Sequence, residues 1–136
     1  MSDRIASDHP SVETVRATIK RHGAGKRLEV DDPIFPESGT IRLEIDGETR
    51  FAAPRERTRI PGAYASPSFA RAPGGKTDYL GQWLDAIERI VGHSVELDII
   101  EPDVAYGVRE PGTTTIYTGI EGPDPSLASI AEDLDS

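Results

Sequence analysis

Arginine and lysine side chains are the residues of this chain best suited to chemistry with a partner, and they form two groups. The first group spans two predicted strands and the turn between them, and the second leads into a long loop. A guanidinium group can hold a phosphate through two parallel hydrogen bonds, so both groups are candidate phosphate contacts. The predicted nucleic-acid-binding residues are Arg16, Lys20, Arg21, Lys26, Arg27, Arg55, Arg57 and Arg59.

Two interpretations of these groups stay open. In the first, basic side chains share one exposed face of a hairpin and contact phosphates, while aromatic side chains of the loop stack on bases. In the second, the arginines pair with acids on neighbouring strands and serve the fold alone. The residues concerned are Arg16, Lys20 and Lys26 for the shared face, Tyr64 and Phe69 for stacking, and Asp31, Glu44 and Glu48 for pairing.

The distribution of charge favours the first interpretation. The chain of 136 residues has a net charge of −9, and twelve of its fifteen basic residues are arginine. Dense carboxylates with few lysines are typical of a halophilic protein, for which global acidity says little about partners. Residues 1–76 carry 13 basic against 11 acidic residues, whereas residues 77–136 carry 2 against 13. The arginine-rich half therefore departs from the acidic background, and this asymmetry is the strongest functional signal in the sequence.

Other chemistries find no support in the residue pattern. The chain has no cysteine, which excludes disulfides and thiolate metal sites. Its three histidines lie far apart and lack the spacing of a zinc site. Gly75-Lys76-Thr77 resembles the end of a phosphate-binding loop, but Ala70 stands where that loop needs its first glycine. We therefore expect no enzymatic activity, no metal and no cofactor.

Period-two alternation of apolar and polar residues predicts a mainly β fold. The expected strands are residues 14–20, 27–30, 40–45, 49–53, 94–100, 104–108 and 113–117. Asp46-Gly47 lies between two alternating runs, which is the strongest short-range signal of a hairpin. A helix over residues 12–23, with Val12, Val15 and Ile19 on one face, is the alternative for the first strand. Residues 55–75 are rich in Pro, Gly, Ser and Ala, and they predict a long loop too polar for the core.

One amphipathic helix is predicted over residues 78–91. Asp78 can cap its N-terminus, and Gly92 can end it. Its expected inward face consists of Leu80, Trp83, Leu84, Ile87, Ile90 and Val91. Asp124-Pro125 predicts a short C-terminal helix with Leu127, Ile130 and Leu134 on one side.

These elements predict a small barrel or pseudobarrel of six to seven strands, with the helix closing one end. The expected organisation is a flexible N-terminal arm (residues 1–11), a single β-rich domain (12–121) and an acidic C-terminal tail (122–136). No run of apolar residues approaches the length that a membrane span needs, and residues 1–10 lack the apolar centre of a secretory signal. We expect a cytoplasmic protein.

Two segments together resemble an uncharacterised haloarchaeal family, a domain of unknown function. They are residues 7–18 (SDHPSVETVRAT) and 104–112 (VAYGVREPG), and the likeness extends over nearly the whole chain. The order of hairpin, helix (LGQWL, 80–84), GHSV (92–95) and strands is similar in architecture to B3-type and AbrB-like DNA-binding pseudobarrels. Those folds tend to carry Gly-Asp where Gly92-His93 stands here. This second resemblance implies that the basic strands and residues 55–76 face DNA.

The sequence thus predicts a nucleic-acid-associated binding module, regulatory in role, with DNA or RNA as its partner. The alternative is a protein–protein adaptor without catalytic activity, which docks its partner through residues 55–76 or through the acidic tail. Arginines already paired within the fold would favour this alternative.

Overall fold

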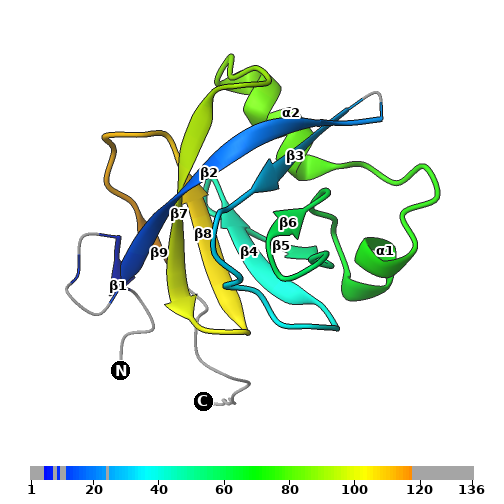
Figure 1. The fold of residues 1–136 in the computed structure, drawn as a ribbon, viewed down its shortest axis with the longest axis horizontal. Helices are drawn as coiled ribbons and strands as arrows, with labels where there is room; N and C mark the ends of the chain where they lie inside the picture. Colours follow the sequence, from blue (N-terminus) through cyan, green and yellow to red (C-terminus); the bar gives the residue numbers. More distant parts are fainter. Residues whose placement is uncertain (1–4, 8, 10–11, 24, 118–136) are drawn as a thin grey trace, which may run out of the picture.

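A seven-stranded sheet that curls into a half-barrel dominates the computed structural model, which describes residues 5–7, 9, 12–23 and 25–117 (Figure 1). The predicted mainly β fold is confirmed. In sheet order the strands are β5 (Glu48–Ala52), β4 (Ile41–Ile45), β8 (Ala105–Arg109), β7 (Ser94–Glu101), β2 (Glu13–His22), β3 (Gly25–Glu29) and β6 (Arg59–Ile60). A second sheet pairs β1 (Ile5–Ala6) with β9 (Ile116–Tyr117). The helices are α1 (Pro67–Arg71) and α2 (Tyr79–Ala86).

Alternation along β2 decides which residues enter the core. Ala17 and Ile19 are fully buried, whereas Arg16 and Lys20 between and beside them are exposed. A helix would have placed these buried and exposed positions on the same side, so the helical alternative for residues 12–23 is wrong. The hairpin predicted at Asp46-Gly47 is confirmed: both residues have positive φ, 52° and 83°, as a tight two-residue turn requires.

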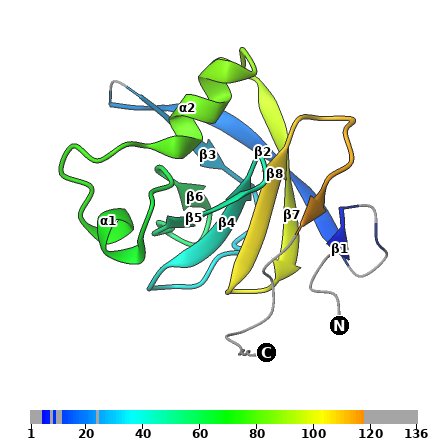
Figure 2. The same cartoon turned by 180° about the vertical axis from the view of Figure 1, so that it is seen from behind.

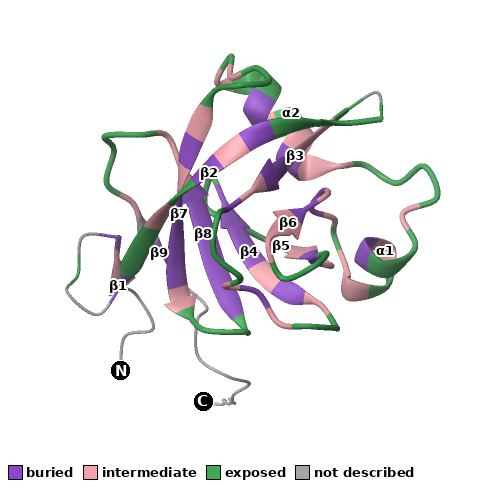
Figure 3. Cartoon of the chain, viewed as in Figure 1, coloured by how far each residue is buried: buried purple, intermediate pink, exposed green. Residues whose placement is uncertain are grey.

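The core fills the concave side of the sheet, as Figure 3 shows along β4, β7 and β8. Alternate residues of the central strands supply it, including Leu43, Leu97 and Val108. Phe35 packs edge-on against Tyr106, with ring centroids 5.0 Å apart. Helix α2 covers one end of the half-barrel in both ribbon views (Figures 1 and 2), and Leu80 and Leu84 are its fully buried residues.

Helix α2 is shorter than predicted. Asp78 caps it as expected, since its Oδ1 accepts hydrogen bonds from the backbone N–H groups of Leu80 and Gly81. The helix ends at Ala86, and Glu88 adopts a left-handed φ of 60°. The backbone N–H of Gly92 then donates to Ile19 in β2, and the N–H of Ile19 donates to His93. These bonds draw the segment toward the sheet, so a helix cannot continue through it.

The expected inward face of the helix is therefore correct only in part. Leu80 and Leu84 are buried, whereas Trp83 and Ile87 are half-buried at the margin of the core. Ile90 and Val91 lie beyond the helix end with 57% and 40% of their surfaces exposed. Trp83, expected on the inward face, is only partly buried and packs against the edge of the core.

The segment 55–75 is more ordered and more buried than predicted. It contains β6 and α1, and Ile60 and Ala63 belong to the core. Two backbone hydrogen bonds of 2.8 Å join Tyr64 to Phe51 in β5, and the N–H of Ala63 donates to Asp78 Oδ1 at 3.0 Å. The interpretation of this segment as a loop too polar for the core is wrong because backbone pairing, rather than an apolar run, fixes its path.

The two ends of the described chain meet in the small sheet. Ile5–Ala6, within the segment expected to be an arm, pairs with Ile116–Tyr117, within the last predicted strand. The predicted C-terminal helix and the acidic tail lie outside the described residues, and the boundaries of the domain stay a prediction. No helix in the described part of the chain is long and apolar enough to cross a membrane.

Candidate nucleic-acid interface

Strands β2 and β3 present basic side chains on the convex side of the sheet. Lys20 lies directly opposite Arg27, and Thr18 lies opposite Glu29. Directly opposite residues of antiparallel strands point to the same side, and the neighbouring residues Ile19 and Leu28 are buried on the other side. Arg16, Lys20 and Arg27 therefore share the outward face. The predicted shared face is wrong in one member: Lys26 lies opposite Arg21 and points to the concave side.

The same outward row continues onto β6 and the turn before it. Glu29 lies opposite Arg59, and an isolated backbone bridge pairs Arg59 with Arg55. We call the outward side chains of this region the basic face. It consists of Arg16, Lys20, Arg27, Arg55 and Arg59, with Glu29 as the acidic residue at its centre.

The turn that carries Arg55 is strained and firmly anchored. Glu56 and Arg57 both have left-handed φ angles, 56° and 62°, which cost roughly 1–2 kcal/mol each for residues with a side chain. Arg57 Nε donates to the carbonyl of Phe35 at 2.9 Å, and the N–H of Phe35 donates back to Arg57. Arg57 therefore holds the turn in place through its Nε, although its side chain is exposed.

Half of the predicted binding residues have no side-chain partner among the described residues. These are Arg16, Lys20, Arg21 and Arg55, and all four are exposed. The other half is engaged in the fold: Lys26 with Asp85, Arg27 with Glu29, Arg57 with the Phe35 carbonyl, and Arg59 with both Glu56 and Glu29. The phosphate interpretation and the pairing interpretation each describe four of the eight residues.

The two ion pairs of Glu29 on the basic face are long, whereas Arg59 also pairs closely with Glu56 and Arg27 donates to the Arg21 carbonyl at 2.7 Å. Glu29 lies 3.7 Å from the Arg27 guanidinium and 3.6 Å from that of Arg59, so one carboxylate is shared between two cations. The acids that pair with arginine here, Glu29 and Glu56, are not those expected from the sequence. The basic face keeps more positive charge than its internal carboxylate neutralises.

A pocket of about 390 Å³ lies beside Arg55 of the basic face. Arg55 and Arg71 line it with His22 and Tyr64. Burial, and secondarily the charge of Asp78, raise the pKa of Tyr64, so its hydroxyl stays protonated and its ring uncharged. Phe69, the other aromatic residue expected to stack, is covered by the Lys76 ammonium at 4.7 Å from its ring centre.

A buried polar cluster under β9 is the feature that sequence reasoning missed. Asp98 is fully buried and accepts hydrogen bonds from Thr14, from Tyr117 and from Arg109, whose Nε lies at 2.8 Å. The hydrogen bond to Asp98 raises the pKa of Arg109, while burial, followed by the bond to Asp98, raises that of Tyr117. Gly107 makes room for the ring, because a Cβ there would lie 2.3 Å from Tyr117. A glycine inside a strand was the available signal.

The arrangement of this cluster indicates a role in stabilising the fold. Every donor around Asp98 is satisfied by the carboxylate, and Arg109 also contacts Glu96 at 3.1 Å. The cluster fastens β9 to the large sheet. Among the residues that the structure describes, no three His, Cys, Asp or Glu side chains converge as a metal site would require.

Comparison with known proteins adds a family but no activity. No curated protein and no solved structure matches the chain. The match to a protein family extends over residues 1–134, which confirms the expectation of an uncharacterised family. The chain belongs to a family of unknown function, DUF7112.

Proposed function

We propose that this domain is a nucleic-acid-binding module of a high-salt cytoplasm and that the basic face is its contact surface. The observation that carries the proposal is the row of outward basic side chains on β2, β3, β6 and the turn before β6, where five cations surround Glu29 and Glu56 pairs with one of them, Arg59. Such a patch is the electrostatic footprint of a phosphate-binding surface, and it stands out in a chain with a net charge of −9.

The side chains without partners among the described residues are spaced far enough apart along the strand to contact separate phosphates. Arg16 and Lys20 are four residues apart on one strand, which corresponds to about 13 Å at about 3.3 Å per residue. Both are exposed and free to follow a phosphate backbone. Arg27 and Arg59 share Glu29 through long contacts, and either can exchange that carboxylate for a phosphate. The architectural likeness to B3-type and AbrB-like pseudobarrels also supports a DNA-facing role for these strands.

High salt demands more than charge. Binding driven by counterion release weakens as the salt concentration rises, so a halophilic binder needs contacts that salt does not screen. The pocket that places Arg55 and Arg71 beside Tyr64 offers one, because a base can stack on an aromatic ring or on a guanidinium plane. We therefore favour a single-stranded or locally opened nucleic acid as the ligand.

The test is a titration with duplex and single-stranded nucleic acid in about 2 M KCl, repeated at lower salt while the fold persists. The informative variant combines Arg16→Gln, Lys20→Gln and Arg55→Gln, three exposed residues without partners. Arg89→Gln is the matched control, because its side chain is also without a partner among the described residues but follows α2. We expect the triple variant to lose at least about tenfold in affinity and the control to bind normally. Equal binding by both variants would overturn the proposal.

A protein–protein adaptor is the second candidate, and one observation favours it. Lys26, Arg27, Arg57 and Arg59 are engaged within the fold, which is the arrangement expected if the arginines serve stability. Absence of nucleic-acid binding at every salt concentration, with the protein folded, would leave this candidate in place.

A further inference from the structure

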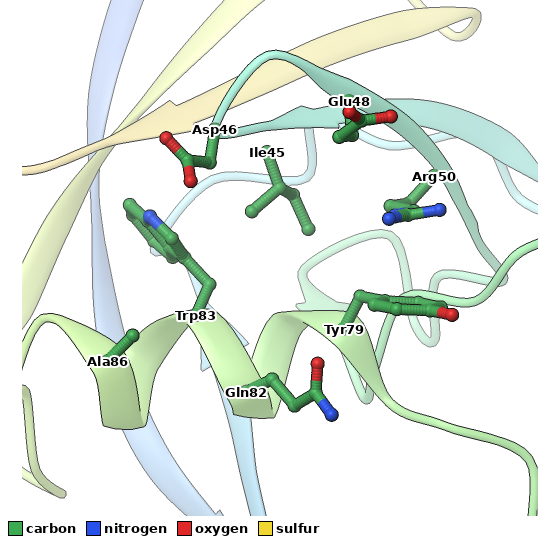
Figure 4. A pocket seen from close by; sticks show the side chains of 8 residues that line it. All are labelled: Ile45, Asp46, Glu48, Arg50, Tyr79, Gln82, Trp83 and Ala86. Carbon is green, nitrogen blue, oxygen red and sulfur yellow. The ribbon is translucent and has the colours of Figure 1, made fainter.

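A pocket of about 220 Å³ lies between α2 and the β4–β5 hairpin, away from the basic face (Figure 4). Ile45 supplies its apolar floor, and Tyr79 and Trp83 are its aromatic walls. Asp46 and Glu48 approach from the hairpin, as Figure 4 shows. We call this the Trp83 pocket. It combines apolar surface with a few convergent polar groups, which is the usual constitution of a small-ligand site.

The pocket already holds one organic cation, supplied by the protein itself. The Arg50 guanidinium of β5 lies over the Tyr79 ring, 3.7 Å from its centre. Figure 4 shows Glu48 beside this arginine. An aromatic face attracts a cation through its quadrupole, and a nearby carboxylate adds a counter-charge. The structure thus contains an occupied example of the interaction that the pocket is suited to make.

One helical turn after Tyr79, Trp83 also presents an aromatic face with a carboxylate nearby, but no cation of the described residues is stacked on it. Residues four apart on a helix lie on the same side, so Tyr79 and Trp83 both face the hairpin. Tryptophan is the strongest of the aromatic residues in binding cations. The indole is half-buried, and no lysine or arginine of the described residues lies over its ring. The Asp46 carboxylate lies beside the indole in Figure 4, where Glu48 lies beside Arg50.

The carboxylates around Trp83 are not neutralised by the protein. Asp46 and Glu48 have no hydrogen bond or ion pair among the described residues. A second pocket of about 250 Å³ adjoins the first, shares Trp83 and Asp46 with it, and adds Glu110. Arg109 lines this second pocket, but Asp98 and Glu96 already hold its guanidinium. The surroundings of the indole therefore carry uncompensated negative charge.

We propose that the Trp83 pocket binds an organic cation, a guanidinium or alkylammonium group, stacked on the indole and paired with Asp46, with Glu48 as the second carboxylate of the pocket. The ligand is either a free amine or a basic side chain of a protein, since both present the same group. This site is independent of the proposed nucleic-acid function, because the Trp83 pocket and the basic face have no residue in common.

The fluorescence of Trp83 reports on binding directly, because Trp83 is the single tryptophan of the chain. The probe is N-acetyl-arginine amide at constant ionic strength, and N-acetyl-citrulline amide is its neutral counterpart of the same shape. We expect a saturable change with the arginine compound and none with the citrulline compound. An equal response to both compounds would overturn the proposal.

Variants locate the site. Asp46→Asn preserves the turn, because asparagine tolerates the positive φ of 52° at this position. Asp103→Asn is the matched control, since Asp103 is also an exposed aspartate with a positive φ, 69°, but lies in the β7–β8 turn. We expect Asp46→Asn to weaken binding about fivefold, Glu48→Gln to weaken it less because Glu48 lies beside Arg50, and the control to leave it unchanged. Identical affinity of the Asp46 and Asp103 variants would contradict the proposal.

A third arm distinguishes the source of the cation. An arginine-containing peptide that binds much more tightly than the free amide indicates a side chain of a protein partner. A polyamine that binds more tightly than the peptide indicates a free amine. Absence of saturable binding by all three probes overturns the site.

Discussion

The basic face and the Trp83 pocket carry surplus charges of opposite sign. On the basic face five cations outnumber the acids that contact them, Glu29, which two arginines share at 3.6 and 3.7 Å, and Glu56, which pairs with Arg59. In the Trp83 pocket the resident cation, Arg50, stacks on Tyr79 beside Glu48, and the carboxylate of Asp46 has no cation among the described residues. Each region keeps a surplus of one sign, so each is suited to a partner of the other sign. The net charge of a small acidic domain therefore says little about what any one face can bind.

The buried cluster around Asp98 contacts residues that border both regions. Arg109 contacts Glu96, which lies opposite Arg16 of the basic face, and it also lines the second pocket beside Trp83. A variant at Asp98 is therefore expected to have the largest effect, because it destabilises the part of the sheet next to both regions.

Asp98→Ala should have the largest effect on stability. It leaves the Arg109 guanidinium and the Tyr117 hydroxyl without their shared acceptor, and breaking a buried charged pair costs about 3–5 kcal/mol. Urea denaturation in high KCl measures the loss, with exposed Glu101→Ala as the control. A loss below about 1 kcal/mol would mean that solvent reaches the cluster and that β9 is not fastened through it.

The contrast between Leu84 and Trp83 should come next. Leu84 is fully buried, and its replacement by alanine should lower the free energy of unfolding by about 2–5 kcal/mol. Trp83 is half-buried, so Trp83→Ala should cost less than Leu84→Ala despite the larger side chain removed. Thermal or urea denaturation of both variants decides the order. The reverse order would make Trp83 a core residue and remove its availability for a ligand.

Testing each charge-neutralised variant with both ligands should show that the two surfaces bind independently. Neutralising Arg16, Lys20 and Arg55 should weaken nucleic-acid binding about tenfold or more and leave the response of Trp83 to arginine amide intact. Asp46→Asn should do the converse, with about a fivefold loss for the cation alone. Parallel titrations of both variants with both ligands give the answer. Loss of both activities in either variant would indicate one coupled site.

Local signals were sufficient for most strands but not for the faces that they present. Alternation in β2 and the Asp46-Gly47 turn depend on neighbouring residues, so the sequence predicts them. The choice between Lys26 and Arg27 as the outward residue depends on the register of the hairpin, and a shift of one residue reverses every side chain. The strands that carry the basic residues were therefore predictable, whereas the faces and the partners of their side chains were not.

Contacts between distant segments account for the remaining differences. Asp98 alternates with buried Leu97 and Ile99, which places it on the convex side, where sequence reasoning expects solvent. It is buried because Tyr117, nineteen residues later, covers it. The Trp83 pocket likewise needs the hairpin at Asp46 and the helix at Tyr79 to meet, and no local pattern encodes that meeting.

The alkaline stability of the chain should give the smallest effect, and it tests the cluster without removing a charge. Burial, together with Asp98, raises the pKa of Tyr117 above the ordinary value of 10.0, so the unfolded state loses the phenol proton first as the pH rises. A raised pKa in the folded state gives a stability contribution that is complete below about pH 10 and is lost progressively above it. Tyr117→Phe removes this contribution and should flatten the decline between pH 9 and about pH 11, as denaturation midpoints at each pH would show. Tyr64 and Tyr106 have raised pKa values as well, so some decline should remain. Parallel curves for the variant and the parent would mean that neither burial nor Asp98 raises the pKa of Tyr117 in the folded state, which would contradict its place in the buried cluster.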